Sequence, residues 1–193
     1  MNTESEEVKS ILFSWVINDV ILKHNFDALR IDTVRHIGMR FWEELSFKLS
    51  ALPVFTLGEV MHGDPSLVSD YQTRGKLDGL LDYPLYYELL NVVVKRQPMS
   101  LLRERYNWEN FLFRDLDTLG VFIDNHDVHR IQHMLLSQKE DALAIKLNIF
   151  TYLYMSYGIP VFYYGTEAGF SGGNDPENRE FFDPQGRHRQ LLD

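Results

Sequence analysis

Residues 26–32 read FDALRID, and this stretch decides the choice of fold. Its apolar part, Ala28–Ile31, has the length of a short buried strand, and the carboxylate of Asp32 follows it directly. Further apolar segments at 54–60, 77–83, 120–123 and 161–164 repeat this pattern. Glu59 lies at the end of the first of these and Asp124 follows the third. Polar groups at the ends of several separate strands are typical of a barrel with its site at the carboxyl ends of the strands.

Amphipathic segments lie between these strands. Apolar residues recur at helical spacing in 8–23, 37–49, 85–94 and 142–157. Strands that alternate with helices indicate parallel βα units, which form either an open doubly wound sheet or a (β/α)8 barrel. The acidic strand ends favour the barrel. Neither a flexible linker nor a repeat interrupts the chain, so we expect one α/β domain over residues 1–193, with a long loop at 169–178.

Composition and charge exclude several classes of partner. The chain has 193 residues, of which 45% are hydrophobic, enough for a sizeable core. A net charge of -9 argues against nucleic acids and anionic membranes, since both require a basic face, and favours a neutral partner. Cysteine is absent, which excludes disulfides and thiolate chemistry. Gly158 and Pro160 interrupt the longest uncharged stretch, so no transmembrane helix is expected, and residues 1–10 do not have the pattern of a signal peptide.

Arg30 and Asp32 are predicted to share one face of the first strand, because side chains two positions apart point the same way. A guanidinium beside a carboxylate in a partly dry site lowers the pKa of the carboxylate and keeps it ionised. An ionised Asp32 can act as a nucleophile. The alternative is a structural ion pair in the barrel interior.

Glu59 ends the second apolar segment, and the nearest basic residues in sequence are Lys48 and Arg74. If Glu59 lies against apolar neighbours, burial raises its pKa and makes it a proton donor near neutral pH. One charged Asp and one protonated Glu are the pair that retaining glycoside hydrolysis requires. The alternative is that Glu59 only ends a strand.

The run at 124–130, DNHDVHR, concentrates carboxylate and imidazole groups. Asp127 can stabilise positive charge at a sugar's anomeric carbon, and His126 can donate to a sugar hydroxyl. The competing interpretation is a metal site formed by His126, Asp127 and His129, since imidazole and carboxylate suit several divalent ions. No paired-ligand spacing such as HExxH supports the metal site.

Three segments resemble, in order, the second, third and fourth signature regions of the α-amylase family, glycoside hydrolase family thirteen. These segments are 26–36 (FDALRIDTVRH), 58–60 (GEV) and 122–127 (FIDNHD). The match extends to 63–65 (GDP), 77–84 (LDGLLDYP), 158–160 (GIP) and 172–180 (GGNDPENRE), which are similar to the secreted, fungal-type α-amylases. The resemblance covers nearly the whole chain and implies an extracellular enzyme.

The resemblance implies a role for each matching residue. Asp32 is expected to be the nucleophile, Glu59 the general acid/base and Asp127 the transition-state stabiliser. The residues expected to orient Asp32 or bind sugar are Arg30, Arg35, His36, His126, Asp175 and Arg179. Arg35 and His36 would lie on the leaving-group side and Asp175 and Arg179 on the other side. The backbone carbonyl of His36 is also expected to help hold a structural calcium, whose remaining ligands are not in this chain.

Parts of the family's pattern have no counterpart in this sequence. These are the first signature, the calcium-binding insertion and the C-terminal β-sandwich. We therefore expect a partial TIM (β/α)8 barrel, strands four to eight with outer helices, and expect residues 1–193 alone to be inactive.

The expected activity is endo-hydrolysis of α-1,4-glucosidic bonds in starch and related glucans by a retaining mechanism, with a separation of about 5 to 5.5 Å between the carboxyl groups of Asp32 and Glu59. The alternatives are an α-glucosidase or transglycosylase of the same family, or a non-catalytic barrel scaffold.

Overall fold

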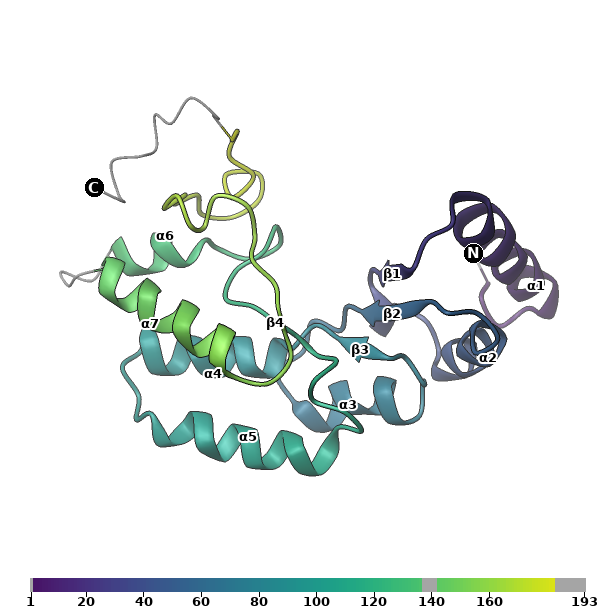
Figure 1. Ribbon diagram of the computed structural model, residues 1–193, viewed down its shortest axis with the longest axis horizontal. Helices are drawn as coiled ribbons and strands as arrows, with labels where there is room; N and C mark the ends of the chain where they lie inside the picture. Colours follow the sequence, from purple (N-terminus) through teal and green to yellow (C-terminus); the bar gives the residue numbers. More distant parts are fainter. Residues whose placement is uncertain (1, 137–141, 183–193) are drawn as a thin grey trace.

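The structure, a computed structural model, describes residues 2–136 and 142–182. Its strands are parallel and lie side by side in sequence order (Figure 1). They are β1 Ala28–Ile31, β2 Phe55–Gly58, β3 Gly79–Leu80, β4 Gly120–Val121 and β5 Ile159–Pro160. A bridge between Leu81 and Gly120 joins the sheet of β1, β2 and β3 to the pair of β4 and β5. The structure therefore confirms the expected partial α/β barrel.

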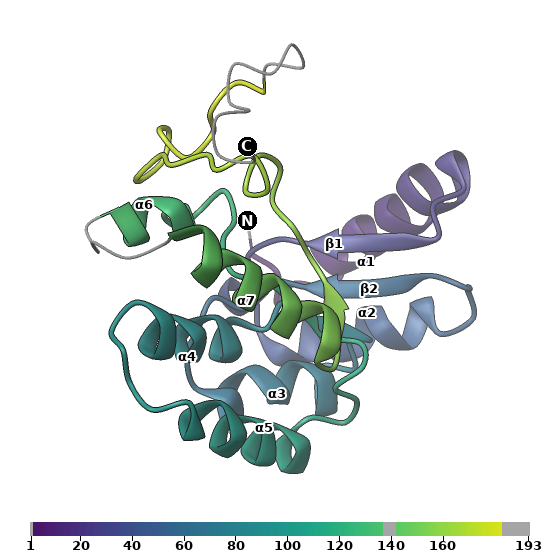
Figure 2. The same cartoon turned by 60° about the vertical axis from the view of Figure 1, so that its left-hand side comes forward.

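Helices follow β1, β2, β3 and β4. The helices are α1 Glu6–Ser14, the π-helical η1 Trp15–Leu22, the short 3-10 helix η2 Val34–His36, α2 Met39–Leu49, α3 Pro65–Thr73, α4 Tyr83–Val93, α5 Ser100–Leu112, α6 Ile131–Leu136 and α7 Ala142–Met155. Figure 2 shows α2, α3, α4 and α5 together below β1 and β2. Among the described residues, no helix is long and apolar enough to cross a membrane.

The predicted elements agree with the structure over most of the chain. β1 has the predicted bounds, while the last strand is Ile159–Pro160 and not the predicted 161–164. The prediction for this strand was wrong because the longest apolar run, 161–164, lies in the loop that follows the strand. The helices α3, α5 and α6 were not predicted. In α5 only Leu102 and Glu109 are buried, so the helix has almost no apolar stripe to detect.

Two apolar clusters pack the helices onto the strands. In the first, Phe13 of α1 and Trp42 and Leu45 of α2 pack near β1 and β2. The indole nitrogen of Trp42 donates to the carbonyl of Val34 at 3.0 Å, which fixes η2 directly after the end of β1. The second cluster packs α4, α6 and α7 around Val121 of β4.

A buried acidic network connects the end of β3 to α5. Asp82 and Glu109 have no exposed surface, and the hydroxyl of Tyr157 lies 3.2 Å from Asp82 Oδ2 and 2.5 Å from Glu109 Oε2. Arg105 lies beside it, with Nε 3.9 Å from Glu109 Oε1 and Nη2 2.9 Å from Glu88 Oε2. A hydroxyl carries one hydrogen, so both Tyr157 contacts are hydrogen bonds only when one of the two carboxyl groups is protonated.

Burial decides which carboxyl group keeps the proton. Burial, together with the nearby charge of Asp82, raises the pKa of Glu109 to about 9. Burial also raises the pKa of Asp82, to about 6, against the hydrogen bond from the Leu85 amide. At neutral pH, Glu109 therefore donates to Tyr157, and Tyr157 donates to an ionised Asp82.

Candidate active site

Arg30 brings together the two carboxyl groups at the ends of β1 and β2. Its Nη2 lies 2.9 Å from Glu59 Oε1 and its Nη1 3.6 Å from Asp32 Oδ1. The side chain leaves the same face of β1 as Asp32, as the strand period predicts, while Leu29 and Ile31 pack against the helix-side cluster. Glu59 thus has a basic partner in space that its sequence neighbours did not reveal.

The side chains of Asp32 and Glu59 also influence each other, because each contributes to the shift in the other's pKa. Arg30 lies within ion-pair distance of both groups, and its charge offsets the repulsion between them. A hydrogen bond between two carboxyl groups requires one proton, which the two groups share.

The environment gives the proton to Glu59. Burial is the first cause that raises the pKa of Glu59, and the hydrogen bond with Asp32 raises it further, while Arg30 and Tyr83 act in the opposite direction. The hydrogen bond with Glu59 is the first cause that lowers the pKa of Asp32, and Arg30 adds to it. The side chain of Glu59 is 6% exposed and that of Asp32 is 63% exposed. The expectation of a partly dry Asp32 was therefore wrong, and solvent access helps to keep this group ionised.

Two residues that the sequence did not indicate support Glu59. The hydroxyl of Tyr83, at the start of α4, donates to Glu59 Oε1 at 3.2 Å. The amide nitrogen of Asn125 donates to the same hydroxyl at 2.9 Å, and Asn125 Oδ1 accepts from the backbone amide of Asp127 at 2.8 Å. A chain of hydrogen bonds therefore connects the end of β2 with the loop after β4. The sequence placed Tyr83 at the end of the predicted strand 77–83 and gave it no role at the site.

The loop after β4 carries a second group of predicted site residues. His126 Nε2 lies 3.2 Å from Asp127 Oδ2, and Arg179 Nη2 lies 3.6 Å from Asp127 Oδ1. Arg179 Nε also pairs with Asp175 Oδ1 at 2.6 Å. The charge of His126 contributes to lowering the pKa of Asp32, so the two groups of residues belong to one site.

Arg35 and His36 lie in η2, at the rim of the same site, and both are exposed. Thr33, between Asp32 and η2, has φ 51 and ψ 34, a left-handed conformation that a β-branched residue rarely adopts. The amide of Val34 donates to the carbonyl of Glu59 at 3.1 Å, which holds this turn against the end of β2. The turn therefore holds η2, which carries Arg35 and His36, against the end of β2.

A family model confirms the resemblance seen in the signature segments. The model of the α-amylase catalytic domain matches residues 1–189. The chain belongs to the α-amylase family. It is 40% identical over 176 residues to the Beta/alpha-amylase of Paenibacillus polymyxa, a match over 86% of this chain and 13% of that protein. It is 38% identical over 187 residues to Alpha-amylase 1 of Lipomyces kononenkoae, covering 96% of this chain and 28% of that protein.

Solved structures of the family have the same fold. The crystal structure of the α-amylase from Geobacillus thermoleovorans in complex with acarbose superimposes with a TM-score of 0.90 at 31% identity. The match covers 100% of this chain and 44% of that one. The chain spans 13% and 28% of the two relatives named above. The barrel strands of this α-amylase-family chain thus correspond to only a part of its relatives.

A cavity of about 270 Å³ lies at the carboxyl ends of the strands of this α-amylase-family chain. Its lining includes Arg30, Glu59, Asn125 and His126, with apolar walls from Phe122 and other side chains. Asp124, which precedes this group, is buried and has a different role. It accepts from the amide of Ile131 at 3.0 Å and so fixes the start of α6.

Calcium fits this part of the chain poorly. Calcium requires six to eight oxygen ligands, and His36 offers one backbone carbonyl. Among the residues that the structure describes, no group of three or more His, Cys, Asp or Glu side chains could hold a metal ion. His126, Asp127 and His129, the ligands of the competing metal interpretation, do not form such a group either.

Proposed function

We propose that this protein is a retaining α-glucan hydrolase of the α-amylase type, in which Asp32 is the nucleophile and Glu59 the general acid/base. The observation that carries the proposal is the pair of opposite pKa shifts on two carboxyl groups that share one guanidinium. A structural ion pair would not require one group to hold a proton. A proton on the buried group and a charge on the exposed group are what a double displacement needs.

In the first step, protonated Glu59 donates its proton to the oxygen of the glycosidic bond as that bond breaks. Asp32 forms a bond to the anomeric carbon, which gives a covalent glycosyl intermediate and releases the leaving chain. In the second step, the Glu59 carboxylate removes a proton from water, and the water oxygen displaces Asp32. Both carboxyl groups return to their starting states. Asp127, beside His126, stabilises the positive charge of the two transition states.

The proposed substrate is the α-1,4-linked glucan of starch or a related polymer, cleaved internally. The names of the relatives support this class, and one solved relative binds acarbose. A neutral polysaccharide also suits a chain of net charge -9. By the same resemblance the protein is proposed to act outside the cell, with residues 1–193 as part of its catalytic barrel.

Covalent trapping tests the nucleophile. The probe is an α-maltosyl fluoride with a second fluorine on the other carbon bonded to the ring oxygen. The second fluorine slows both formation and hydrolysis of the glycosyl intermediate, and the fluoride leaving group still allows the intermediate to form. We expect the glycosyl adduct on the peptide that contains Asp32, and no adduct in Asp32→Asn. Asp117→Asn, an exposed carboxylate before β4, is the matched control. A stable adduct on another residue would contradict the assignment.

Glu59→Gln tests the proton donor. We expect starch hydrolysis to be lost and cleavage of α-maltosyl fluoride to be kept in part, because fluoride leaves without a proton. Equal losses on both substrates would contradict the role of Glu59. Product analysis on long glucans then separates the alternatives: internal cuts indicate an α-amylase, single glucose units an α-glucosidase, and longer products a transglycosylase. A wild-type protein that binds glucans without cleaving them would indicate a non-catalytic scaffold.

A further inference from the structure

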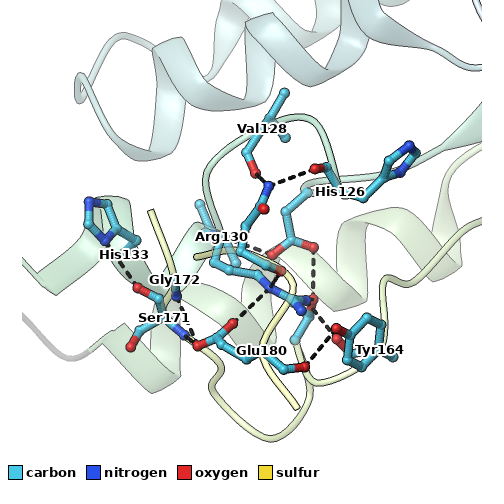
Figure 3. A network of polar contacts seen from close by, with 12 residues as sticks. His126, Val128, Arg130, His133, Tyr164, Ser171, Gly172 and Glu180 are labelled. Carbon is cyan, nitrogen blue, oxygen red and sulfur yellow. Dashed lines mark hydrogen bonds and ion pairs between the residues drawn. The ribbon is translucent and has the colours of Figure 1, made fainter. Parts of the chain in front are cut away.

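Two loops that lie far apart in the sequence are joined around His126 and Val128 (Figure 3). The side-chain amide of Asn178 donates to the carbonyl of His126 at 2.8 Å and to the carbonyl of Val128 at 2.9 Å. One amide group therefore binds the backbone on both sides of Asp127. Asn178 is fully buried, and two carbonyl acceptors fix the orientation of its amide.

Arg130 binds the backbone of Asn178, while the Asn178 side chain binds the loop around Asp127. Its side chain is fully buried, and its Nε donates to the carbonyl of Asn178 at 3.0 Å. Its Nη1 donates to the carbonyl of Tyr164 at 2.6 Å, and the guanidinium lies over the Tyr163 ring at 3.9 Å. Arg130 thus ties the loop after β4 and the loop after β5 to the backbone of Asn178.

Glu180 completes the connection. Its Oε2 lies 3.2 Å from Arg130 Nε, and its Oε1 accepts from the amides of Ser171 and Gly172 at 2.7 and 2.9 Å. The hydroxyl of Tyr164 donates to the carbonyl of Glu180 at 2.7 Å. Figure 3 shows the Glu180 carboxylate between Arg130 and the amides of Ser171 and Gly172. Arg130 lies in the loop after β4, and Asn178 and Glu180 lie in the loop after β5. Their contacts therefore join the two loops.

We propose that Asn178, Arg130 and Glu180, here called the loop clamp, are positioning residues that hold Asp127 and Arg179 as one unit. Arg179 directly follows Asn178 in the chain. Because the Asn178 side chain binds the backbone on both sides of Asp127, it also sets the position of Arg179 relative to Asp127, which lies 3.6 Å away. The inference rests on the proposed function, in which Asp127 stabilises the transition state. Its consequence is that a glucan residue bound by Arg179 is fixed relative to the reacting carbon.

The loop clamp acts through other residues, because Asn178 and Arg130 are buried away from any sugar. A merely structural role would lower stability and leave the turnover of the folded protein unchanged. A positioning role changes kcat more than KM, because a small displacement of Asp127 weakens an interaction that is strongest in the transition state. The two roles are therefore separable by kinetics on the folded fraction.

The main variant is Asn178→Ala, which removes both hydrogen bonds to the Asp127 backbone. We expect kcat on maltopentaose to fall by about tenfold to a hundredfold, with KM changed by less than about threefold. Asn174→Ala, an exposed amide in the same loop, is the matched control and keeps the wild-type kcat. Glu180→Gln retains the shape and weakens the pair with Arg130, so a smaller loss in the same direction is expected where Asn178→Ala does not fold.

A double variant tests the coupling. If the loop clamp acts through Arg179, the loss in kcat/KM for Asn178→Ala with Arg179→Ala is smaller than the product of the two single losses. Independent losses that multiply would overturn the coupling. A wild-type kcat in both Asn178→Ala and Glu180→Gln would overturn the proposal as a whole.

Hydrogen exchange provides a readout that does not depend on activity. In Asn178→Ala we expect faster exchange of the backbone amides of 126–130 and 171–173, and in Asn174→Ala the wild-type rates. A complete wild-type enzyme without turnover would refute the proposed function, and the exchange rates would still decide whether the loop clamp holds the two loops. Unchanged exchange in Asn178→Ala would refute the loop clamp even in an active enzyme.

Discussion

Glu109→Gln should make the fold more tolerant of alkaline pH. In the folded chain, Glu109 keeps its proton up to about pH 9, because burial and the nearby charge of Asp82 both oppose ionisation. In the unfolded chain a glutamate releases its proton near its ordinary pKa of about 4.3. A carboxyl group whose pKa is raised on folding stabilises the fold at low pH, and this contribution is lost as the pH rises towards the folded pKa.

The magnitude follows from the number of protons involved. Where the folded state binds one more proton than the unfolded state, the unfolding free energy falls by about 1.4 kcal/mol for each unit of rising pH. Between about pH 6.5 and about pH 8.5 the loss from Glu109 is therefore about 2 to 3 kcal/mol. Asp82, with a pKa of about 6, is mostly ionised throughout this window and contributes little to the slope. The amide that Glu109→Gln introduces keeps a donor to Tyr157 and carries no titrating proton.

Urea unfolding at these pH values, followed by tryptophan fluorescence, measures the slope. We expect the unfolding free energy of the wild type to fall with pH and that of Glu109→Gln to fall about 2 to 3 kcal/mol less over the same window. Glu104→Gln, an exposed glutamate on the same helix, is the control and should keep the wild-type slope. Equal slopes for Glu109→Gln and the wild type would refute the assignment of the proton to Glu109.

Three further substitutions test the site and the sheet. Tyr83→Phe removes a hydrogen bond that lowers the pKa of Glu59, so the alkaline limb of the pH–activity profile should move to higher pH, with kcat reduced by about tenfold. Arg30→Gln removes a charge that lowers the pKa of the predicted nucleophile, so the acidic limb should also move to higher pH; an unchanged limb would contradict the ion pair. Gly79→Ala places a Cβ against the carbonyl of Thr118, and calorimetry should show a destabilisation of about 1 to 3 kcal/mol.

The parallel strand order and the three acidic strand ends could be predicted from the sequence. Short apolar segments that end in Asp32, Glu59 and the run at 124–127 place these side chains at one edge, because parallel strands present their carboxyl ends to the same side. The strand period also placed Arg30 beside Asp32. These features depend on local periodicity, which one sequence records directly.

Other features arise only from contacts between segments that are distant in sequence. Arg30 is closer to Glu59 than to Asp32, and Tyr83 and Asn125 support Glu59 from two other strand ends. The solvent exposure of Asp32 depends in the same way on which segments surround it. No spacing rule relates these positions, since their separation in space is set by packing of the whole sheet.

The sequence by itself determined the α/β barrel class, the catalytic carboxylate candidates and, through its signature segments, the family. Only the tertiary structure decided how the proton is distributed between Asp32 and Glu59, that Glu109 is buried with Asp82, and that Asn178 holds the backbone around Asp127. The physical reason is that periodicity and motifs are local properties of the chain. Burial and hydrogen-bond partners, which set pKa values and hold loops, are properties of the folded whole.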